Sequence, residues 1–212
     1  MLGRMTHERI RELLAPFLEG NHISNEQVRL LSAHMELLLK WNSRINLTSI
    51  TEPEQILTRH VGESLFAARK LSQDSGPFGS LIDVGSGAGF PGIPIKIWAQ
   101  LDVILVESRQ KKATFLREVA RTLGFHGFEI ANKRAEDLGS QADVVTLRAV
   151  EKFDQSLPVA ASLVKGGGRL ALLIGGQQVG SASSLLPQFS WDHPIPIPQS
   201  VSRVVLIGRA SV

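Results

Sequence analysis

The stretch that most constrains the fold of this 212-residue chain is LIDVGSGAGFPGIPIKI, residues 81–97. It begins with four residues typical of a buried strand, turns through three closely spaced glycines, and continues into a helical pattern. A buried strand that leads through glycines into a helix is the opening unit of a doubly wound α/β sheet. Because glycine has no side chain, such a turn also lets the backbone approach a ligand closely.

After this unit, strand and helix patterns alternate along the chain. Helices are expected at residues 92–99, 109–124 and 151–164, with apolar runs between them that are typical of strands. This alternation predicts a mostly parallel sheet with helices on both faces, a Rossmann-like fold. The last two strands lack an intervening helix, so they are expected to pair antiparallel at one edge. The expected strands are residues 81–84, 102–107, 128–132, 142–148, 168–175, 190–198 and 200–210.

The first third of the chain has helical spacing of its apolar residues instead. Ser24, followed three residues later by Gln27, is a capping box that starts the second of three expected helices. The polar stretch SQDSGPFGS, residues 72–80, contains glycine and proline and is the best candidate for a linker. The sequence therefore predicts a helical subdomain over residues 1–72 and a sheet domain over residues 80–212.

Composition and charge exclude several classes of protein. The chain has no cysteine, so disulfides and thiolate nucleophiles are absent, and its six histidines are too scattered to form a helical metal pair. The N-terminal segment is too charged for a signal peptide, and no apolar run reaches the roughly 18 residues that a membrane span needs. A net charge of +3 permits a polyanionic partner. We expect a cytoplasmic protein without metal, membrane contact or obligate protein partner.

The glycine loop fits two kinds of ligand. Gly87, Gly89 and Gly92 match the G-x-G-x-x-G pattern of dinucleotide sites. Glu107 ends the next strand about 20 residues further on, where such sites place an acid that binds the ribose. Asp83 argues against a dinucleotide, because a carboxylate just ahead of the glycines repels a pyrophosphate.

S-adenosylmethionine carries an ammonium and a sulfonium group, and the Asp83 carboxylate attracts both. Pro91 and Pro94 favour the same ligand, because they remove amide donors that a phosphate would use. In that case Glu107 accepts both ribose hydroxyls of the adenosine. Two alternatives stay open: Asp83 as a helix cap, and Glu107 as the ion-pair partner of a lysine one helical turn away.

Two further segments supply candidate ligand contacts. In this fold the loop after the third strand, residues 132–138, closes over the adenine, so Ala135 and Glu136 are candidate contacts to the base. Arg148 ends the fourth strand. It is either an ion-pair anchor for a neighbouring acid or a contact to an anionic substrate.

Six segments of the chain occur together in a characteristic order: WNSRINLTSI (41–50), RHVGESL (59–65), DVGSGAGFPGIP (83–94), ESRQKKATFL (107–116), RAED (134–137) and LRA (147–149). In these segments the chain resembles the GidB/RsmG family, bacterial methyltransferases that modify guanine N7 in small-subunit ribosomal RNA. The resemblance covers nearly the whole chain and implies the class I methyltransferase fold with S-adenosylmethionine as cofactor. It also implies cofactor contacts from Gly85, Phe90, Ala135, Glu136 and Arg148.

Methylation of guanine N7 needs no general base, because N7 carries a free lone pair at neutral pH. The sequence shows no nucleophile with an adjacent base, which fits catalysis by proximity and orientation. The product base is cationic, so Asp83 and Glu63 are candidates to stabilise it. Basic side chains at the cleft mouth are expected to bind ribosomal RNA or the small ribosomal subunit. The candidate substrate contacts are Asn46, Arg59, His60, Glu63 and Arg148.

Three other functions stay open on the sequence. A nicotinamide-dependent oxidoreductase would bind NAD, and a non-catalytic RNA-binding or ribosome assembly factor would bind RNA without methylating it. A methyltransferase of a small molecule or a protein would have a largely neutral cleft mouth. The candidate cofactor contacts are Asp83, Gly85, Gly87, Gly89, Phe90, Glu107, Ala135, Glu136 and Arg148.

Overall fold

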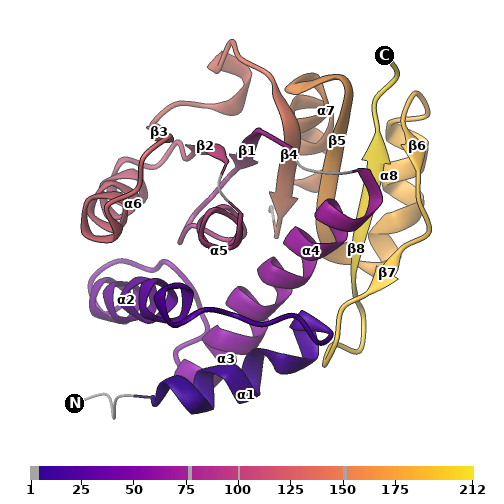
Figure 1. The fold of residues 1–212 in the computed structure, drawn as a ribbon. Helices are drawn as coiled ribbons and strands as arrows, with labels where there is room; N and C mark the ends of the chain where they lie inside the picture. The colour runs from indigo at the N-terminus through magenta and orange to yellow at the C-terminus, as the bar shows by residue number, and fades with distance from the viewer. Residues whose placement is uncertain (1–4, 76–77, 100, 150–151) are drawn as a thin grey trace.

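The computed structural model describes residues 5–75, 78–99, 101–149 and 152–212. Its centre is an eight-stranded sheet of order β3-β2-β1-β4-β5-β8-β6, in which β7 also pairs with β8 (Figure 1). Strands β1 to β5 are parallel and β8 runs antiparallel to β5, so the predicted doubly wound, mostly parallel sheet is confirmed. The strands are β1 (Ser80–Val84), β2 (Asp102–Val106), β3 (Phe128–Ala131), β4 (Ala142–Arg148), β5 (Val164–Gly175), β6 (Ser190–Trp191), β7 (Ile195–Pro196) and β8 (Arg203–Arg209).

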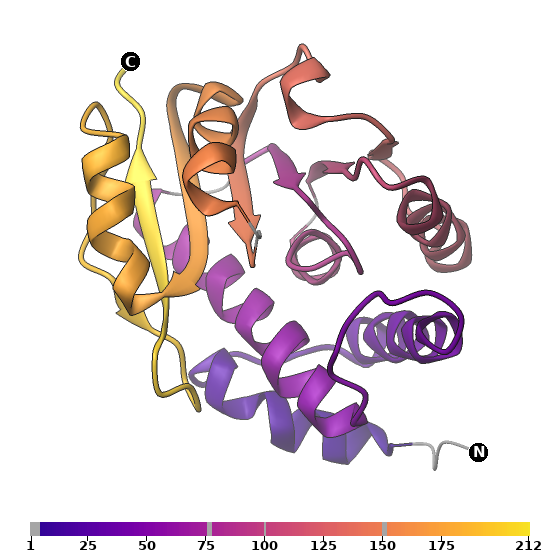
Figure 2. The same cartoon turned by 180° about the vertical axis from the view of Figure 1, so that it is seen from behind.

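Helices cover both faces of the sheet. On one face α4, α5 and α6 pack against the strands, and α1 and α2 lie outside them (Figure 1). The opposite face is covered by α7 and α8 (Figure 2). The helices are α1 (His7–Leu18), α2 (Asn25–Asn42), α3 (Pro53–Ile56), the π-helical turn η1 (Leu57–Gly62), α4 (Glu63–Ser75), α5 (Gly92–Trp98), α6 (Gln110–Leu123), the 3-10 turn η2 (Ala135–Asp137), α7 (Phe153–Ser162), the 3-10 turn η3 (Gly176–Gln178) and α8 (Val179–Leu185).

Neighbouring residues of a strand enter different cores, because their side chains point to opposite faces of the sheet. In β1, Leu81 packs with the helices of the N-terminal region, whereas Ile82 packs with α7 and α8. The first of these clusters reaches outward to Leu14 of α1. The N-terminal helices and one face of the sheet thus share a continuous core, and the division into residues 1–72 and 80–212 stays a prediction.

The helix boundaries in the N-terminal region follow the sequence signals with one difference. Ser24 Oγ accepts from the Gln27 amide at 3.1 Å, and the Gln27 side chain accepts from the Ser24 amide at 2.9 Å, so the expected capping box is present. The third helix starts at Pro53 as α3, passes through η1 and continues as α4 to Ser75. Residues 72–75 of the expected linker are therefore helical, since they contain neither glycine nor proline.

The C-terminal region contains a helix that the sequence did not indicate. α8 contains three serines and one glycine, which are weak helix formers, and it is held by burial of Ala182 on the outer face of the sheet. β6 and β7 pair antiparallel with β8, as expected for strands without a helix between them. Residues 76–77 of the expected linker and residue 151 of the helix expected at 151–164 lie outside the described residues. Among the helices described, none is long and apolar enough to cross a membrane.

Candidate functional site

The candidate site lies at the carboxyl end of β1, where the glycine loop leads into α5. Gly85, Gly87 and Gly89 have positive φ angles of 72°, 55° and 89°, a region that other residues rarely adopt. A β-carbon at Gly89 would also overlap the side chain of Ile93 in α5. The shape of the loop therefore depends on these glycines.

Glu107 follows β2 and stands beside the glycine loop. Its Oε2 accepts from the Gly87 amide at 3.1 Å, and its Oε1 accepts from the Arg109 amide at 2.7 Å. These partners are backbone amides, not the lysines of the ion-pair alternative. A carboxylate has about four acceptor positions, so Glu107 retains the capacity to accept two ribose hydroxyls.

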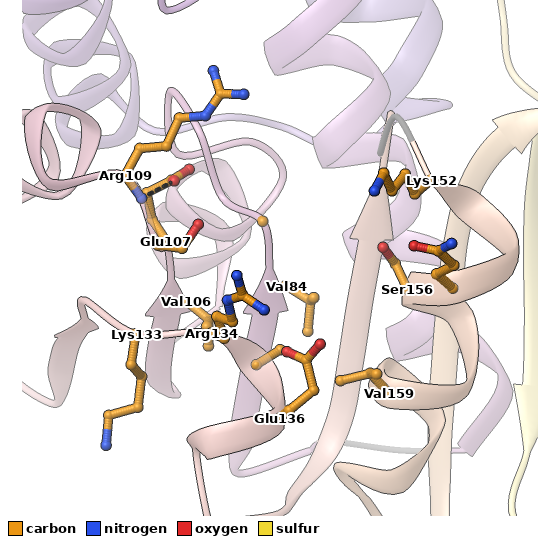
Figure 3. A pocket seen from close by; sticks show the side chains of 14 residues that line it. Val84, Val106, Glu107, Arg109, Lys133, Arg134, Glu136, Lys152, Ser156 and Val159 are labelled. Carbon is orange, nitrogen blue, oxygen red and sulfur yellow. Dashed lines mark hydrogen bonds between the residues drawn. The ribbon is translucent and has the colours of Figure 1, made fainter.

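Glu107 opens onto a pocket of about 520 Å³ beyond the ends of β1 and β2, which we name the strand-tip pocket. Figure 3 shows Glu107 on one side of it and Lys152, at the start of α7, on the other. The expected cofactor contacts Gly85, Ala135 and Glu136 meet Glu107 here. The pocket is lined by Val84, Gly85, Val106, Glu107, Ser108, Arg109, Lys133, Arg134, Ala135, Glu136, Lys152, Gln155, Ser156 and Val159.

A second pocket, of about 260 Å³, lies on the other side of the glycine loop. We name it the N-terminal pocket, because residues 47–49 and His60 form one of its walls. It shares Gly85 with the strand-tip pocket, so one ligand can contact both. Phe90 and Arg148, which the resemblance placed at the cofactor, line this second pocket. The full lining is Leu47, Thr48, Ser49, His60, Gly85, Ser86, Gly87, Ala88, Phe90, Lys112, Arg148 and Ala149.

Asp83 lies behind the loop and lines neither pocket. Its Oδ2 accepts from the Gly92 amide at 3.2 Å, and its Oδ1 accepts from the Thr146 hydroxyl at 2.8 Å. The residue is 1% exposed, and burial raises its pKa to about 6. This carboxylate caps α5, as in the alternative interpretation, and its expected contact to the cofactor and to the product base stays a prediction.

The first turn of α5 offers no free amide to a phosphate. The Gly92 amide is bonded to Asp83. The Ile93 amide donates to the Gly89 carbonyl at 2.8 Å, and Pro94 has no amide hydrogen. Dinucleotide sites use such amides to hold the pyrophosphate. The strand order also departs from the 3-2-1-4-5-6 order of dinucleotide domains, because antiparallel β8 is inserted between β5 and β6. The site therefore does not fit a nicotinamide dinucleotide.

His60 lies on η1, a π-helical turn of the kind often found at functional sites. Its Nδ1 lies 3.0 Å from Arg148 Nη2, and its Nε2 lies 2.8 Å from Thr48 Oγ1. Its ring stacks on Phe90 with the ring centres 4.8 Å apart. Burial and the neighbouring arginines lower the pKa of His60 to about 3, so the imidazole is neutral at pH 7.

A buried ion cluster holds Arg148 in place. The Glu63 carboxylate is 1% exposed and lies 3.0 Å from the guanidinium groups of both Arg148 and Arg203. Arg59 adds a third ion pair at 3.4 Å, and its carbonyl accepts from Arg148 at 2.7 Å. Arg148 is thus an ion-pair anchor that also lines the N-terminal pocket. Glu63 lines neither pocket, and arginines surround its carboxylate. Its expected contact to the product base stays a prediction.

Asn42, at the end of α2, holds the loop that closes the N-terminal pocket. Its Oδ1 accepts from the amides of Leu47 and Thr48, each at 2.9 Å, and its Nδ2 donates to the Thr48 carbonyl at 2.9 Å. Asn46 of the same loop lies elsewhere, in a neighbouring hollow of about 310 Å³ formed with basic residues of α6. Residues 45–46 of this loop therefore line the neighbouring hollow, whereas residues 47–49 line the N-terminal pocket.

Two of the remaining site candidates lie outside both pockets, and two contributors were missed. Gly89 lines neither pocket, and Arg59 acts through its ion pair and carbonyl. The missed residues are Thr48 and Arg203. Thr48 stands in the segment WNSRINLTSI, which carries the resemblance, so a signal for it existed. Arg203 starts β8, within a stretch that was expected as a strand but carries no functional motif, so the sequence held no signal for its role.

Metal ligation finds no support in the described part of the chain. It contains no group of three or more histidine, aspartate or glutamate side chains placed to hold a metal ion. The groups available to a ligand are therefore the backbone of the glycine loop, the carboxylates of the strand-tip pocket, and the arginine, histidine and threonine of the N-terminal pocket. They suit a ligand that combines hydroxyls, a flat base and charged ends.

Several solved structures similar to this chain are methyltransferases. Magnesium protoporphyrin IX methyltransferase from Synechocystis, solved with bound SAH, superimposes with a TM-score of 0.62 at 14% identity, covering 84% of this chain and all of that one. Ribosomal protein L11 methylase from Lactobacillus delbrueckii gives a TM-score of 0.59 at 17% identity, covering 72% and 79%. At such identities these likenesses establish the fold alone.

Sequence comparison is more specific. The chain matches the family model GidB, rRNA small subunit methyltransferase G, over residues 27–185. A ribosomal RNA small subunit methyltransferase G from Nitrosomonas eutropha is 33% identical over 202 residues, 92% of this chain and 90% of the relative. Its namesake from Alkaliphilus metalliredigens is 38% identical over 156 residues, 70% of this chain and 64% of the relative. The resemblance read from the sequence is thereby confirmed, and the chain belongs to the GidB family, rRNA small subunit methyltransferase G.

Proposed function

We propose that this chain transfers a methyl group from S-adenosylmethionine to guanine N7 of small-subunit ribosomal RNA. As a member of the GidB family it is an S-adenosylmethionine-dependent methyltransferase. One observation carries the choice of ligand: Glu107 faces a pocket beside a glycine loop whose following helix has no free amide. Such a site suits a ribose without a pyrophosphate.

The two adjoining pockets fit the two halves of this cofactor. In the strand-tip pocket Glu107 accepts the ribose hydroxyls, and Ala135 and Glu136 contact the adenine. The chain of the cofactor passes Gly85 into the N-terminal pocket, where the Arg148 guanidinium donates to its carboxylate. Support for this placement comes from the lining of both pockets. When bound, the cofactor supplies a methyl group carried by a sulfonium.

The residues of the chain bind and orient, and none has to move a proton. The N7–carbon bond forms as the carbon–sulfur bond breaks, and the positive charge passes from sulfur to the purine. His60 is neutral at pH 7, so it repels neither cation. The wall formed by residues 47–49 and the glycine loop hold the base and the methyl donor together, and this proximity lowers the barrier.

Basic side chains beside both pockets suit an RNA substrate. Lys133 and Arg134 line the strand-tip pocket, and Lys111 and Lys112 line the neighbouring hollow with Asn46. Lysine and arginine side chains bind phosphates by neutralising their charge. A polyanion lying across these surfaces places a base at the N-terminal pocket. The partner is ribosomal RNA, free or within the small ribosomal subunit.

Isotopic methyl transfer tests this function. Small-subunit ribosomal RNA from a strain that lacks the protein is incubated with the enzyme and labelled S-adenosylmethionine, then digested to nucleosides. Label is expected in 7-methylguanosine alone. Label in another nucleoside would show a different target atom. RNA binding without any label would support an assembly factor, and both results contradict the proposal.

A further inference from the structure

Thr48 lies in the wall of the N-terminal pocket, and nothing in the methyl transfer itself requires it. It shares the pocket with Phe90 and Arg148. Asn42 accepts from the Thr48 amide and donates to its carbonyl, each at 2.9 Å. The backbone of Thr48 is therefore held fixed, and its hydroxyl has a defined position at the pocket.

Arg148 determines which nitrogen of His60 carries the proton. A guanidinium can only donate hydrogen bonds, and Arg148 Nη2 lies 3.0 Å from His60 Nδ1. Nδ1 is therefore an acceptor, and the single proton of the neutral ring is on Nε2. It follows that Nε2–H donates to Thr48 Oγ1 at 2.8 Å.

Towards a ligand, the Thr48 hydroxyl can consequently act only as a donor. Its oxygen accepts from His60 Nε2 at 2.8 Å and from the Ile50 amide at 3.1 Å. A hydroxyl has two lone pairs and one hydrogen, so both acceptor positions are used. The described residues offer no acceptor for the remaining O–H. That hydrogen is available to whatever enters the pocket.

We propose that Thr48 selects guanine over adenine by donating this hydrogen bond to O6 of the target base, an inference that rests on the proposed function. On the edge that bears N7, guanine presents the O6 acceptor and adenine presents the N6 amino donor. The Thr48 hydroxyl donates a hydrogen bond to guanine O6. With adenine it would face another donor, the N6 amino group, and could form no hydrogen bond. A buried donor that has no partner destabilises a complex by more than a typical hydrogen bond stabilises it. His60 is a positioning residue here, because it acts through Thr48.

Removal of O6 from the substrate tests this inference. Ribosomal RNA is prepared with either guanosine or 2-aminopurine riboside at the methylated nucleotide; the analogue keeps N7 and lacks O6. For the unmodified enzyme, kcat/KM is expected to be about tenfold or more lower with the analogue. Thr48→Val has no donor and is expected to treat both RNAs alike. Thr48→Ser keeps the donor and is expected to discriminate as the unmodified enzyme does.

Thr58→Val is the matched control, because the same change is made on η1 at a hydroxyl that bonds to the Glu54 carbonyl. It is expected to retain full discrimination. Should Thr48→Val turn over neither RNA, the ratio of the two Kd values measured with S-adenosylhomocysteine present replaces the kinetic ratio. The inference is overturned if Thr48→Val discriminates normally or if the unmodified enzyme does not discriminate. Failure of the unmodified enzyme to methylate the guanosine RNA overturns the proposed function instead.

Discussion

The two pockets that meet at Gly85 are built in opposite ways. The strand-tip pocket takes its residues from the ends of β1 and β2, from the turns after β1, β2 and β3, and from α7. Its main carboxylate, Glu107, bonds to backbone amides. The N-terminal pocket joins residues 47–49, η1 and the end of β4, and buried side-chain charges hold it. The first pocket is a property of the α/β sheet, which related folds share. The second depends on the helices that this chain packs against the sheet.

The largest effect is expected for the stability of the fold, which should depend on the buried ion pairs behind the N-terminal pocket. Glu63→Gln removes the carboxylate that pairs with the guanidinium groups of Arg59, Arg148 and Arg203. Uncompensated buried charge costs about 3–5 kcal/mol, so a decrease of that size is expected in the free energy of unfolding measured by chemical denaturation. Glu129→Gln, at an exposed glutamate of β3, is the matched control and is expected to cost less than about 0.5 kcal/mol. Equal decreases would show that the cluster does not support the pocket.

The strand-tip pocket is expected to control cofactor affinity instead. Glu107→Gln weakens the acceptors proposed for the ribose and makes one of them a donor. Hydrogen bonds to charged groups contribute about 1.5–3 kcal/mol, so calorimetry with S-adenosylhomocysteine should show an affinity decrease of about 10- to 100-fold. Glu129→Gln again serves as the control. An unchanged affinity for Glu107→Gln would remove the ribose contact from the proposal.

Sensitivity to acid is expected to come from the N-terminal side of the glycine loop. His34 of α2 is buried, and its Nε2 lies 2.9 Å from the Ala88 carbonyl of that loop. Burial lowers the pKa of His34 from 6.5 to about 4. Below pH 6.5 the unfolded chain therefore binds a proton that the folded chain rejects, and stability is lost as the pH falls towards 4.

His34→Gln keeps a donor for the Ala88 carbonyl and removes this titration. Between pH 7 and pH 5 the variant should lose about 2 kcal/mol less stability than the unmodified chain, measured by chemical denaturation at both values. His126→Gln, at an exposed histidine, is expected to leave the pH dependence unchanged. Identical pH dependence for His34→Gln and the unmodified chain would contradict the assignment.

The smallest expected effect concerns RNA binding by the basic surface beside the two pockets. Lys111 lines the hollow beside Asn46. If it contacts a phosphate, Lys111→Gln should lower the slope of log K against log salt by about 0.7 to 0.9. Lys165 lies at the start of β5, and its ammonium pairs with Asp143 of β4. Lys165→Gln is the control and should leave the slope unchanged. A slope that shifts equally in both variants would indicate a general charge effect.

Much of the strand-tip pocket was predictable because its residues occupy fixed places in a strand–turn–helix unit. Gly85 and Glu107 follow consecutive strands, and the ends of parallel strands lie side by side. Two roles stayed open for Asp83, since the sequence does not reveal whether a side chain at a strand end points to the pocket or to the following helix. α8 was missed for another reason: its serine-rich sequence becomes helical only through packing.

By itself, the amino-acid order determined the parallel sheet, the helical N-terminal region, the glycine loop and the family, because these depend on periodicity and on short spacings along the chain. Tertiary structure alone decided the N-terminal pocket. Glu63 meets Arg148 across 85 residues and Arg203 from still further along the chain, and Thr48 acquires its donor role from a histidine that an arginine of β4 orients. No local sequence pattern links residues that lie so far apart along the chain. Only the packing of the helices on the folded sheet therefore specifies these contacts.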